Sequence, residues 1–169
     1  MPDSDQGIGR GRYRVIPRTV IFLRRGDSYL LIKGSTTKRL WPDRYNGVGG
    51  HLDRGEDVLS SASRELLEET GLEADLWLCG TVIVDAGDVG VGLFVFSGEV
   101  TGGSLRGSAE GTPEWIPFER VGSLPAVQDV QPLLLRLHRM QRGDVPFAAR
   151  SFYDDSGNLQ LVFESHPNS

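Results

Sequence analysis

Cysteine is almost absent from this chain, and long apolar runs are missing altogether. Cys79 is the single cysteine in 169 residues, so no disulfide forms within the chain and a reducing, cytoplasmic environment is expected. No run of about 18 apolar residues occurs, which disfavours a membrane-spanning helix. The polar first residues lack the pattern of a signal peptide, and secretion is therefore not expected.

A surplus of positive charge is also lacking. The chain has 18 Lys and Arg against 23 Asp and Glu, which argues against a broad basic surface for nucleic-acid polymers. Many of its basic residues still crowd the first 44 positions, either as a solvated rim or as contacts for phosphate groups. With 38% hydrophobic and 24% charged residues, the composition is that of one globular domain. We expect this domain at residues 13–165, after a flexible lead-in at 1–12 and before a tail at 166–169.

Several common catalytic patterns are missing. The three histidines, His51, His138 and His166, are far apart in the sequence and form no zinc-binding pattern. The sequence contains no G-x-S-x-G nucleophile turn, no Walker A loop and no G-x-G-x-x-G dinucleotide fingerprint. Zinc enzymes, esterases of the α/β-hydrolase type and P-loop or Rossmann nucleotide-binding proteins are therefore disfavoured.

Runs of β-branched and apolar residues alternate with glycine-rich turns, and two segments have helical periodicity. We expect helices at residues 57–70, where Leu59, Ala62 and Leu66 form an apolar stripe, and at 130–142. Mixed strands with two helices predict an α/β or α+β sandwich with additional hairpins. The expected strands are 15–23 with 29–33 as a hairpin, 76–84, 91–96, 114–117, and 147–153 with 159–163 as a last hairpin; residues 34–50 are a long loop.

The first of these helices carries three glutamates at a spacing that suits metal binding. Glu65 is three residues before Glu68 and four before Glu69, so a helix projects all three carboxylates from one side. Their mutual repulsion is partly offset if Arg64 pairs with Glu68, four residues on. Clustered carboxylate oxygens are ligands that Mg²⁺ and Mn²⁺ prefer. The alternative is an exposed acidic face that makes only surface ion pairs.

The residues that flank these glutamates form a longer pattern. The order is Gly50, five residues, Glu56, seven residues, Arg64-Glu65-Leu66, one residue, Glu68-Glu69, one residue and Gly71-Leu72. Coincidence at the fixed positions has a probability on the order of 10⁻⁸ per starting position, from average residue usage. Over residues 50–72 the chain resembles the Nudix hydrolases, whose signature box it matches at every defined position.

The resemblance implies a mixed sheet sandwiched between two main helices, and an enzyme that hydrolyses diphosphate linkages in nucleotide-type substrates with Mg²⁺, or Mn²⁺ as a substitute. It implies catalytic roles for Arg64, Glu65 and Glu68. Arg64 would orient the glutamates, and Glu65 would be either a ligand or the general base. The implied metal ligands are Glu65, Glu68 and Glu69, with Glu56, the Gly50 carbonyl and, in some relatives, a further glutamate that corresponds here to Glu110.

Shorter segments outside the box resemble the MutT-like branch, which hydrolyses oxidised purine nucleoside triphosphates. Residues 45–50 are similar to a stretch in which an asparagine touches the base, here Asn46, although an Asn-Gly turn is the alternative. Gln128 and Asp129 lie where this branch reads the purine edge, although Asp129 is also a suitable helix cap. Lys33 resembles a phosphate-binding lysine, and Thr19 completes the expected substrate-binding set.

Other functions within and beyond this family stay open at this point. The nearest alternatives are hydrolases of ADP-ribose, nucleotide sugars or dinucleoside polyphosphates. A non-catalytic domain that senses nucleotides is the alternative from a different class, although such domains usually lose a box glutamate and this chain keeps Glu65, Glu68 and Glu69. The expected partner is a small nucleotide, without nucleic-acid polymer or membrane, and the chain is expected to be a monomer or a homodimer.

Overall fold

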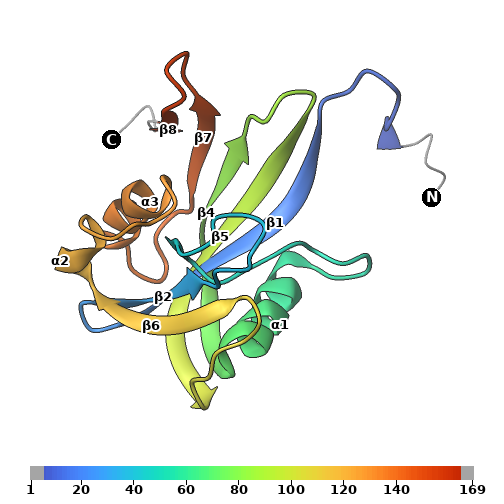
Figure 1. Cartoon of the computed structure of the whole chain (residues 1–169). Coiled ribbons are helices and arrows are strands. Elements are labelled where there is room, and N and C mark those ends of the chain that lie inside the picture. Colours follow the sequence, from blue (N-terminus) through green and yellow to red (C-terminus); the bar gives the residue numbers. More distant parts are fainter. Residues whose placement is uncertain (1–5, 165–169) are drawn as a thin grey trace.

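The computed structural model describes residues 6–164, which form a mixed sheet between helices (Figure 1). The helix α1 (Val58–Thr70) packs on one face, and α3 (Val130–Leu137) with the short α2 (Phe118–Val121) packs on the other. This arrangement confirms the predicted fold class. The expected tail at 166–169 and the first five residues of the expected lead-in lie outside the described residues.

Eight strands make up the sheet, in the order β3-β2-β1-β5-β4-β7-β8, with β6 paired to β2. The β1–β5 and β4–β7 pairs are parallel, and the other neighbouring pairs are antiparallel. The strands are β1 (Arg14–Arg25), β2 (Ser28–Gly34), β3 (Tyr45–Asn46), β4 (Leu72–Val84), β5 (Val89–Gly103), β6 (Gly111–Pro117), β7 (Phe147–Tyr153) and β8 (Leu159–Phe163).

Strand β1 divides the core because its side chains alternate between the two faces of the sheet. Val20 and Phe22 are buried in the cluster on the α3 side, whereas Ile21 and Leu23 are buried on the α1 side. The predicted β1–β2 hairpin pairs only beside its turn, and most of β1 instead runs parallel to β5. The other edge of β1 binds the segment 48–51, which holds that part of the long loop against the sheet.

The prediction of a helix over residues 130–142 was wrong at its C-terminal end. The helix α3 stops at Leu137, the last residue of its buried apolar stripe. His138 follows as the cap and stacks on Phe118, with ring centroids 3.8 Å apart, and its Nδ1 lies 3.1 Å from the Tyr29 hydroxyl. The helix therefore ends where His138 makes these tertiary contacts, and not at Gly143, five residues later.

The predicted apolar stripe of α1 also needs correction. Leu59 is 48% exposed, whereas Ala62 and Leu66 are buried and Val58 packs beside them. The stripe thus runs through positions 58, 62 and 66, one residue out of phase with the prediction at its start. Strands β4 and β6 begin earlier than predicted, and the short strand β3 forms within the expected loop. Among residues 6–164, no helix is long and apolar enough to cross a membrane.

Candidate functional site

The loop that follows β3 runs against β1 and brings two glycines to the side of α1. The Thr19 N–H donates to the Gly50 carbonyl at 2.9 Å, and the Ile21 N–H donates to the Val48 carbonyl at 2.6 Å. A Cβ on Gly49 would overlap the Thr19 carbonyl, and one on Gly50 would lie 2.5 Å from Glu65 Oε1. The fold requires glycine at position 49, where backbone approaches backbone, whereas at position 50 the absence of a Cβ makes room for the Glu65 carboxylate.

Arg64 lies at the centre of a network of acidic side chains. Its guanidinium donates to Glu56 at 2.5 and 2.9 Å, to Glu65 at 3.0 Å and to Glu68 at 3.2 Å. The first of these contacts, with a backbone N–H donated by Asp53, lowers the pKa of Glu56 to about 2. The pair between Arg64 and Glu68 that the helical spacing predicts is present. One cation thus fixes the orientation of three carboxylates.

The three glutamates of the helix lie in different environments. Glu69 is 8% exposed, and burial followed by the nearby charge of Glu65 raises its pKa to about 8. Burial also raises the pKa of Glu65, although Arg64 opposes that shift. The Glu68 side chain is 59% exposed. Glu65 and Glu69 therefore face the Gly49-Gly50 loop, and Glu68 lies at the surface.

The chemistry of this cluster fits a hard divalent cation, although its geometry is not that of a finished metal site. Among residues 6–164, no three carboxylate, histidine or cysteine side chains already converge as a ligand set. Arg64 accounts for this because it holds Glu56, Glu65 and Glu68 around itself. Burial disfavours the charged forms of Glu65 and Glu69 and raises the pKa values of both. A bound cation would stabilise these charged forms.

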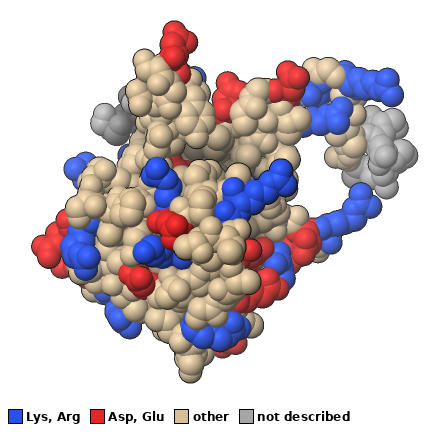
Figure 2. Space-filling view, in the orientation of Figure 1, with Lys and Arg blue, Asp and Glu red and all other residues tan. Residues whose placement is uncertain are grey.

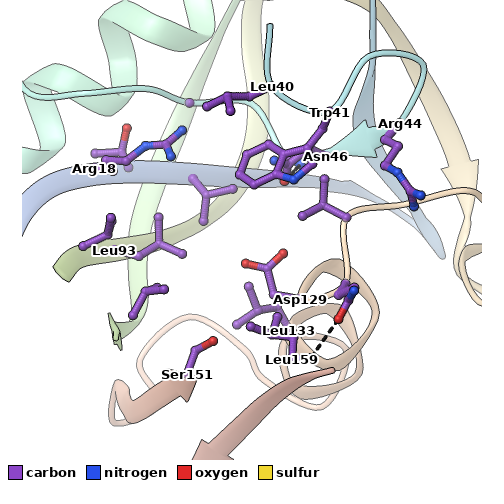
Figure 3. A pocket seen from close by; sticks show the side chains of 18 of the residues that line it. Arg18, Leu40, Trp41, Arg44, Asn46, Leu93, Asp129, Leu133, Ser151 and Leu159 are labelled. Carbon is purple, nitrogen blue, oxygen red and sulfur yellow. Dashed lines mark hydrogen bonds between the residues drawn. The ribbon is translucent and has the colours of Figure 1, made fainter. Parts of the chain in front are cut away.

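A cavity of about 360 Å³ begins at this cluster and extends across the sheet. Its lining includes Glu69 of the acidic helix and Gly49 of the loop, together with Asn46 and Asp129. Figure 3 shows the Asp129 carboxylate pointing into the cavity, toward Trp41 and Asn46. On the face seen in Figure 2, Lys and Arg side chains are interspersed with Asp and Glu rather than gathered in a basic patch.

Asp129 stands at the N-cap position of α3 without acting as a cap. Within the described chain its side chain makes no cap hydrogen bond, and its backbone is helical, with φ −83° and ψ −14°. Burial raises the pKa of its carboxyl, an effect that the charge of Arg18 partly opposes. The alternative role as a helix cap is therefore not realised, and the carboxylate is left to the cavity.

Asn46 reaches the cavity through backbone pairing. The Tyr45 N–H donates to the Pro125 carbonyl at 3.0 Å, and the Val127 N–H donates to the Tyr45 carbonyl at 2.9 Å. These bonds hold β3 beside the segment that leads to Asp129. The Asn46 Oδ1 accepts the Gly47 N–H at 2.7 Å, and Asn46 lines the cavity.

The remaining predicted residues divide between the cavity and its surroundings. Thr19 is buried and lines the cavity, with a hydroxyl that lacks a hydrogen-bond partner among residues 6–164. Gln128 also lines it, but its Oε1 accepts the Leu159 N–H at 2.8 Å. Lys33 is exposed on β2 and does not line the cavity, whereas Lys38 does and pairs with Glu110 at 3.0 Å.

Sequence reasoning missed several residues of the cavity. Trp41 in the long loop and Ser151, Tyr153 and Leu159 on the last hairpin were missed, whereas Arg18 and Lys38 belong to the crowded N-terminal basic residues without having been singled out. Of the four residues missed altogether, Trp41 alone had a signal, as an aromatic residue inside a long loop of polar and glycine residues. Its φ of +52° turns the loop over the cavity, a conformation that sequence periodicity does not reveal.

A mixed sheet between helices, with a glutamate-rich helix held against a Gly-Gly loop, defines the class of this domain. A family model described as NUDIX domain matches residues 14–137. The match covers most of the chain and includes the acidic helix, the loop and Asp129. The chain belongs to the NUDIX domain family.

Proteins similar to this chain have names that state different substrates. The oxidized purine nucleoside triphosphate hydrolase of Mus musculus is 33% identical over 82 residues, 46% of this chain and 52% of that protein. The NAD-capped RNA hydrolase NudC of Stutzerimonas stutzeri (strain A1501) is 26% identical over 132 residues, 76% of this chain and 46% of that protein. This chain thus spans about half the length of these relatives. The mutator MutT protein from Bacillus halodurans shares the fold, with a TM-score of 0.71 at 21% identity, over 90% of this chain and 100% of that chain.

Proposed function

We propose that this chain hydrolyses a diphosphate linkage of a purine nucleoside triphosphate, releasing the nucleoside monophosphate and pyrophosphate. The observation that carries the proposal is one cavity lined both by Glu69 of the acidic helix and by Asn46 and Asp129, whose carboxylate makes no cap bond to α3 within the described chain. A triphosphate, with a metal ion, suits the glutamate end. A heterocycle with hydrogen-bond donors on its edge suits the carboxylate end.

The proposed metal is Mg²⁺, held by Glu65, Glu68 and Glu69 with help from Glu56, Glu110 and the Gly50 carbonyl. When bound, such a cation neutralises a diphosphate and lowers the pKa of an attacking water. Arg64 orients Glu65 through its bond to Oε1 at 3.0 Å. If Glu65 is the general base instead of a ligand, its oxygen Oε2 would accept the proton of that water, a role that suits a carboxylate whose pKa burial raises.

Removal of the metal is expected to abolish turnover, and its affinity is expected to depend on pH. Below the pKa of Glu69, which is about 8, a binding cation must displace a proton from this carboxyl. The apparent affinity for Mg²⁺ should therefore rise with pH up to about 8 and then level off. Calorimetric titrations at pH 6, 7, 8 and 9, with melting temperatures and rates measured in excess chelator, check this. Undiminished turnover in chelator would refute the metal assignment.

The substrate class is tested by a panel of diphosphate compounds with Mg²⁺. The panel contains normal and oxidised purine nucleoside triphosphates, ADP-ribose, nucleotide sugars and dinucleoside polyphosphates. Preferred cleavage of a purine triphosphate, with pyrophosphate as product, supports the proposal. A preference for another member assigns the chain to that substrate, and binding of nucleotides without any turnover assigns it a sensing function.

Two substitutions in the lining of the cavity test base recognition. Asn46→Ala and Asp129→Ala are each expected to lower kcat/KM for the preferred purine nucleotide roughly 10- to 100-fold, because each removes a hydrogen bond to a desolvated base edge. The melting temperature should change little for Asp129→Ala, since this side chain makes no cap bond to α3 within the described chain. Glu119→Ala, an exposed substitution in the short helix α2, is the control. If both variants rank the purine substrates as the wild type does, neither Asn46 nor Asp129 recognises the base.

A further inference from the structure

The last hairpin, β7–β8, begins after the segment that the family model matches, which ends at residue 137. It is nevertheless part of the sheet. Strand β7 pairs parallel with β4, which places Ser151 opposite Val84, and β8 pairs antiparallel with β7. The Asp85 N–H also donates to the Ser151 carbonyl at 2.8 Å. The hairpin is therefore fixed to the end of β4 that forms the floor of the cavity.

One face of the hairpin lines the cavity. Ser151 and Tyr153 on β7 and Leu159 on β8 are among the lining residues, and register places Leu159 opposite Tyr153. In Figure 3 Ser151 and Leu159 lie on the side of the cavity away from Trp41. Tyr153 is 58% exposed, so its aromatic ring stands at the rim of the cavity rather than in the core. Val162, paired with Arg150, lies on the opposite face because side chains alternate along a strand.

A side-chain bond joins the hairpin to the segment that carries Asp129. The Gln128 Oε1 accepts the Leu159 N–H at 2.8 Å, across 31 positions of sequence. Gln128 is exposed, so this bond is not required to satisfy a buried group. Its effect is to hold the first residue of β8 beside the residue that precedes Asp129. The position of the cavity wall and the position of the carboxylate are thereby coupled.

We propose that the β7–β8 hairpin is a specificity-determining element that binds the heterocyclic end of the nucleotide, with Tyr153 and Leu159 packing against the planar ring. The proposal rests on the proposed function for the identity of the ligand as a nucleotide. Leu159 supplies an apolar wall on the side of the cavity away from Trp41, and Tyr153 adds an aromatic ring at the rim. Apolar and aromatic side chains of this kind pack against a flat heterocycle. On this proposal the phosphates bind near Glu69 on α1, an element other than the hairpin.

Equilibrium binding separates contacts with the ring from contacts with the phosphates. The two probes are a non-hydrolysable α,β-methylene purine nucleoside triphosphate and inorganic tripolyphosphate, each titrated calorimetrically in the presence of Mg²⁺. Tyr153→Ala is expected to raise the Kd of the nucleotide about 10-fold and leave the Kd of tripolyphosphate unchanged. Tyr153→Phe keeps the ring and should bind the nucleotide nearly as well as the wild type. Val162→Ala, on the other face of the same hairpin, should change neither Kd.

The measured Kd values decide whether the hairpin binds the heterocyclic ring. Equal nucleotide Kd values in the wild type and Tyr153→Ala overturn the proposal, and so does an equal rise for both probes. A wild type that binds tripolyphosphate but no nucleotide overturns it as well. If the wild type binds the nucleotide analogue but cleaves none of the panel, the proposed function fails, while the Kd differences still decide the role of the hairpin.

The bond from Gln128 is tested through its acceptor oxygen. Gln128→Leu removes the acceptor and should raise the nucleotide KM several-fold with little change in kcat, because the wall and Asp129 lose their fixed spacing. Gln128→Glu keeps an oxygen for the Leu159 N–H and should restore the KM toward that of the wild type. A KM that is unchanged in Gln128→Leu would show that the hairpin needs no such anchor.

Discussion

Glu69→Gln is expected to lower kcat/KM at least about 10²-fold and, in the absence of metal, to raise the melting temperature. Activity falls because an amide is a poor substitute for a carboxylate ligand, and loss of a ligand impairs both activation of water and neutralisation of phosphate. Stability rises because Glu69 is buried beside Glu65, and Gln carries no charge to be desolvated. Opposite changes in rate and stability are the mark of a site optimised for binding a cation rather than for folding.

The gain in stability has a predictable pH dependence. The folded-state pKa of Glu69, about 8, lies above its ordinary value of 4.5, so the proton it holds stabilises the metal-free fold at low pH. That contribution is complete below about pH 4.5 and is lost as the pH rises through 8. Glu69→Gln should therefore match the wild type near pH 5 and melt a few degrees higher near pH 9. Added Mg²⁺ should narrow the difference by stabilising only the wild type.

Two further variants serve as controls. Glu73→Gln removes an exposed carboxylate just after α1 and should change neither rate nor melting temperature. The double variant Glu68→Gln/Glu69→Gln should be barely slower than the slower single variant, since ligands of one metal act as a unit. Near-native rates in both single variants, with every substrate of the panel, would show that the metal lies elsewhere.

The acidic helix shows what local spacing determines. Residues three and four apart on a helix are neighbours whatever surrounds them, so the pairing of Arg64 with Glu68 follows from the sequence. The link from Arg64 to Glu56 does not, because it depends on how the loop before the helix folds back. Burial of Glu69 likewise depends on the loop at Gly49, which is positioned by pairing with β1.

Motif comparison singles out Lys33, whereas the lysine that lines the cavity is Lys38. Successive side chains of a strand point to opposite faces, so at most one of Ile32 and Lys33 faces the cavity. The structure places Ile32 there, and the lysine of the cavity is Lys38, from a loop without periodicity. The hairpin around Tyr153 was predicted as strands, but its place at the cavity follows from the parallel pairing of β7 with β4. Such long-range pairing is not encoded in any local pattern.

The two glycines beside the acidic helix are expected to respond differently to alanine. A Cβ on Gly49 would overlap the backbone carbonyl of Thr19, which cannot move without breaking the bonds that join the loop to β1. We expect Gly49→Ala to lower the free energy of unfolding by about 2–4 kcal/mol, in the range of substitutions that introduce steric overlap in a packed site. Chemical denaturation with urea measures this change directly.

A Cβ on Gly50 meets a side chain instead of the backbone. It would lie 2.5 Å from Glu65 Oε1, and that carboxylate can rotate away at little cost to the fold. Gly50→Ala should therefore leave the free energy of unfolding within about 1 kcal/mol of the wild type. The displaced Glu65 can no longer hold its bond to Arg64 or its place beside the loop, and kcat/KM should fall roughly 10- to 100-fold. Gly9→Ala, at a glycine with open space around it, is the matched control and should change neither quantity. If Gly50→Ala were destabilised as strongly as Gly49→Ala while retaining its rate per folded molecule, the glycine would serve the fold alone, and Glu65 would have no part in the chemistry.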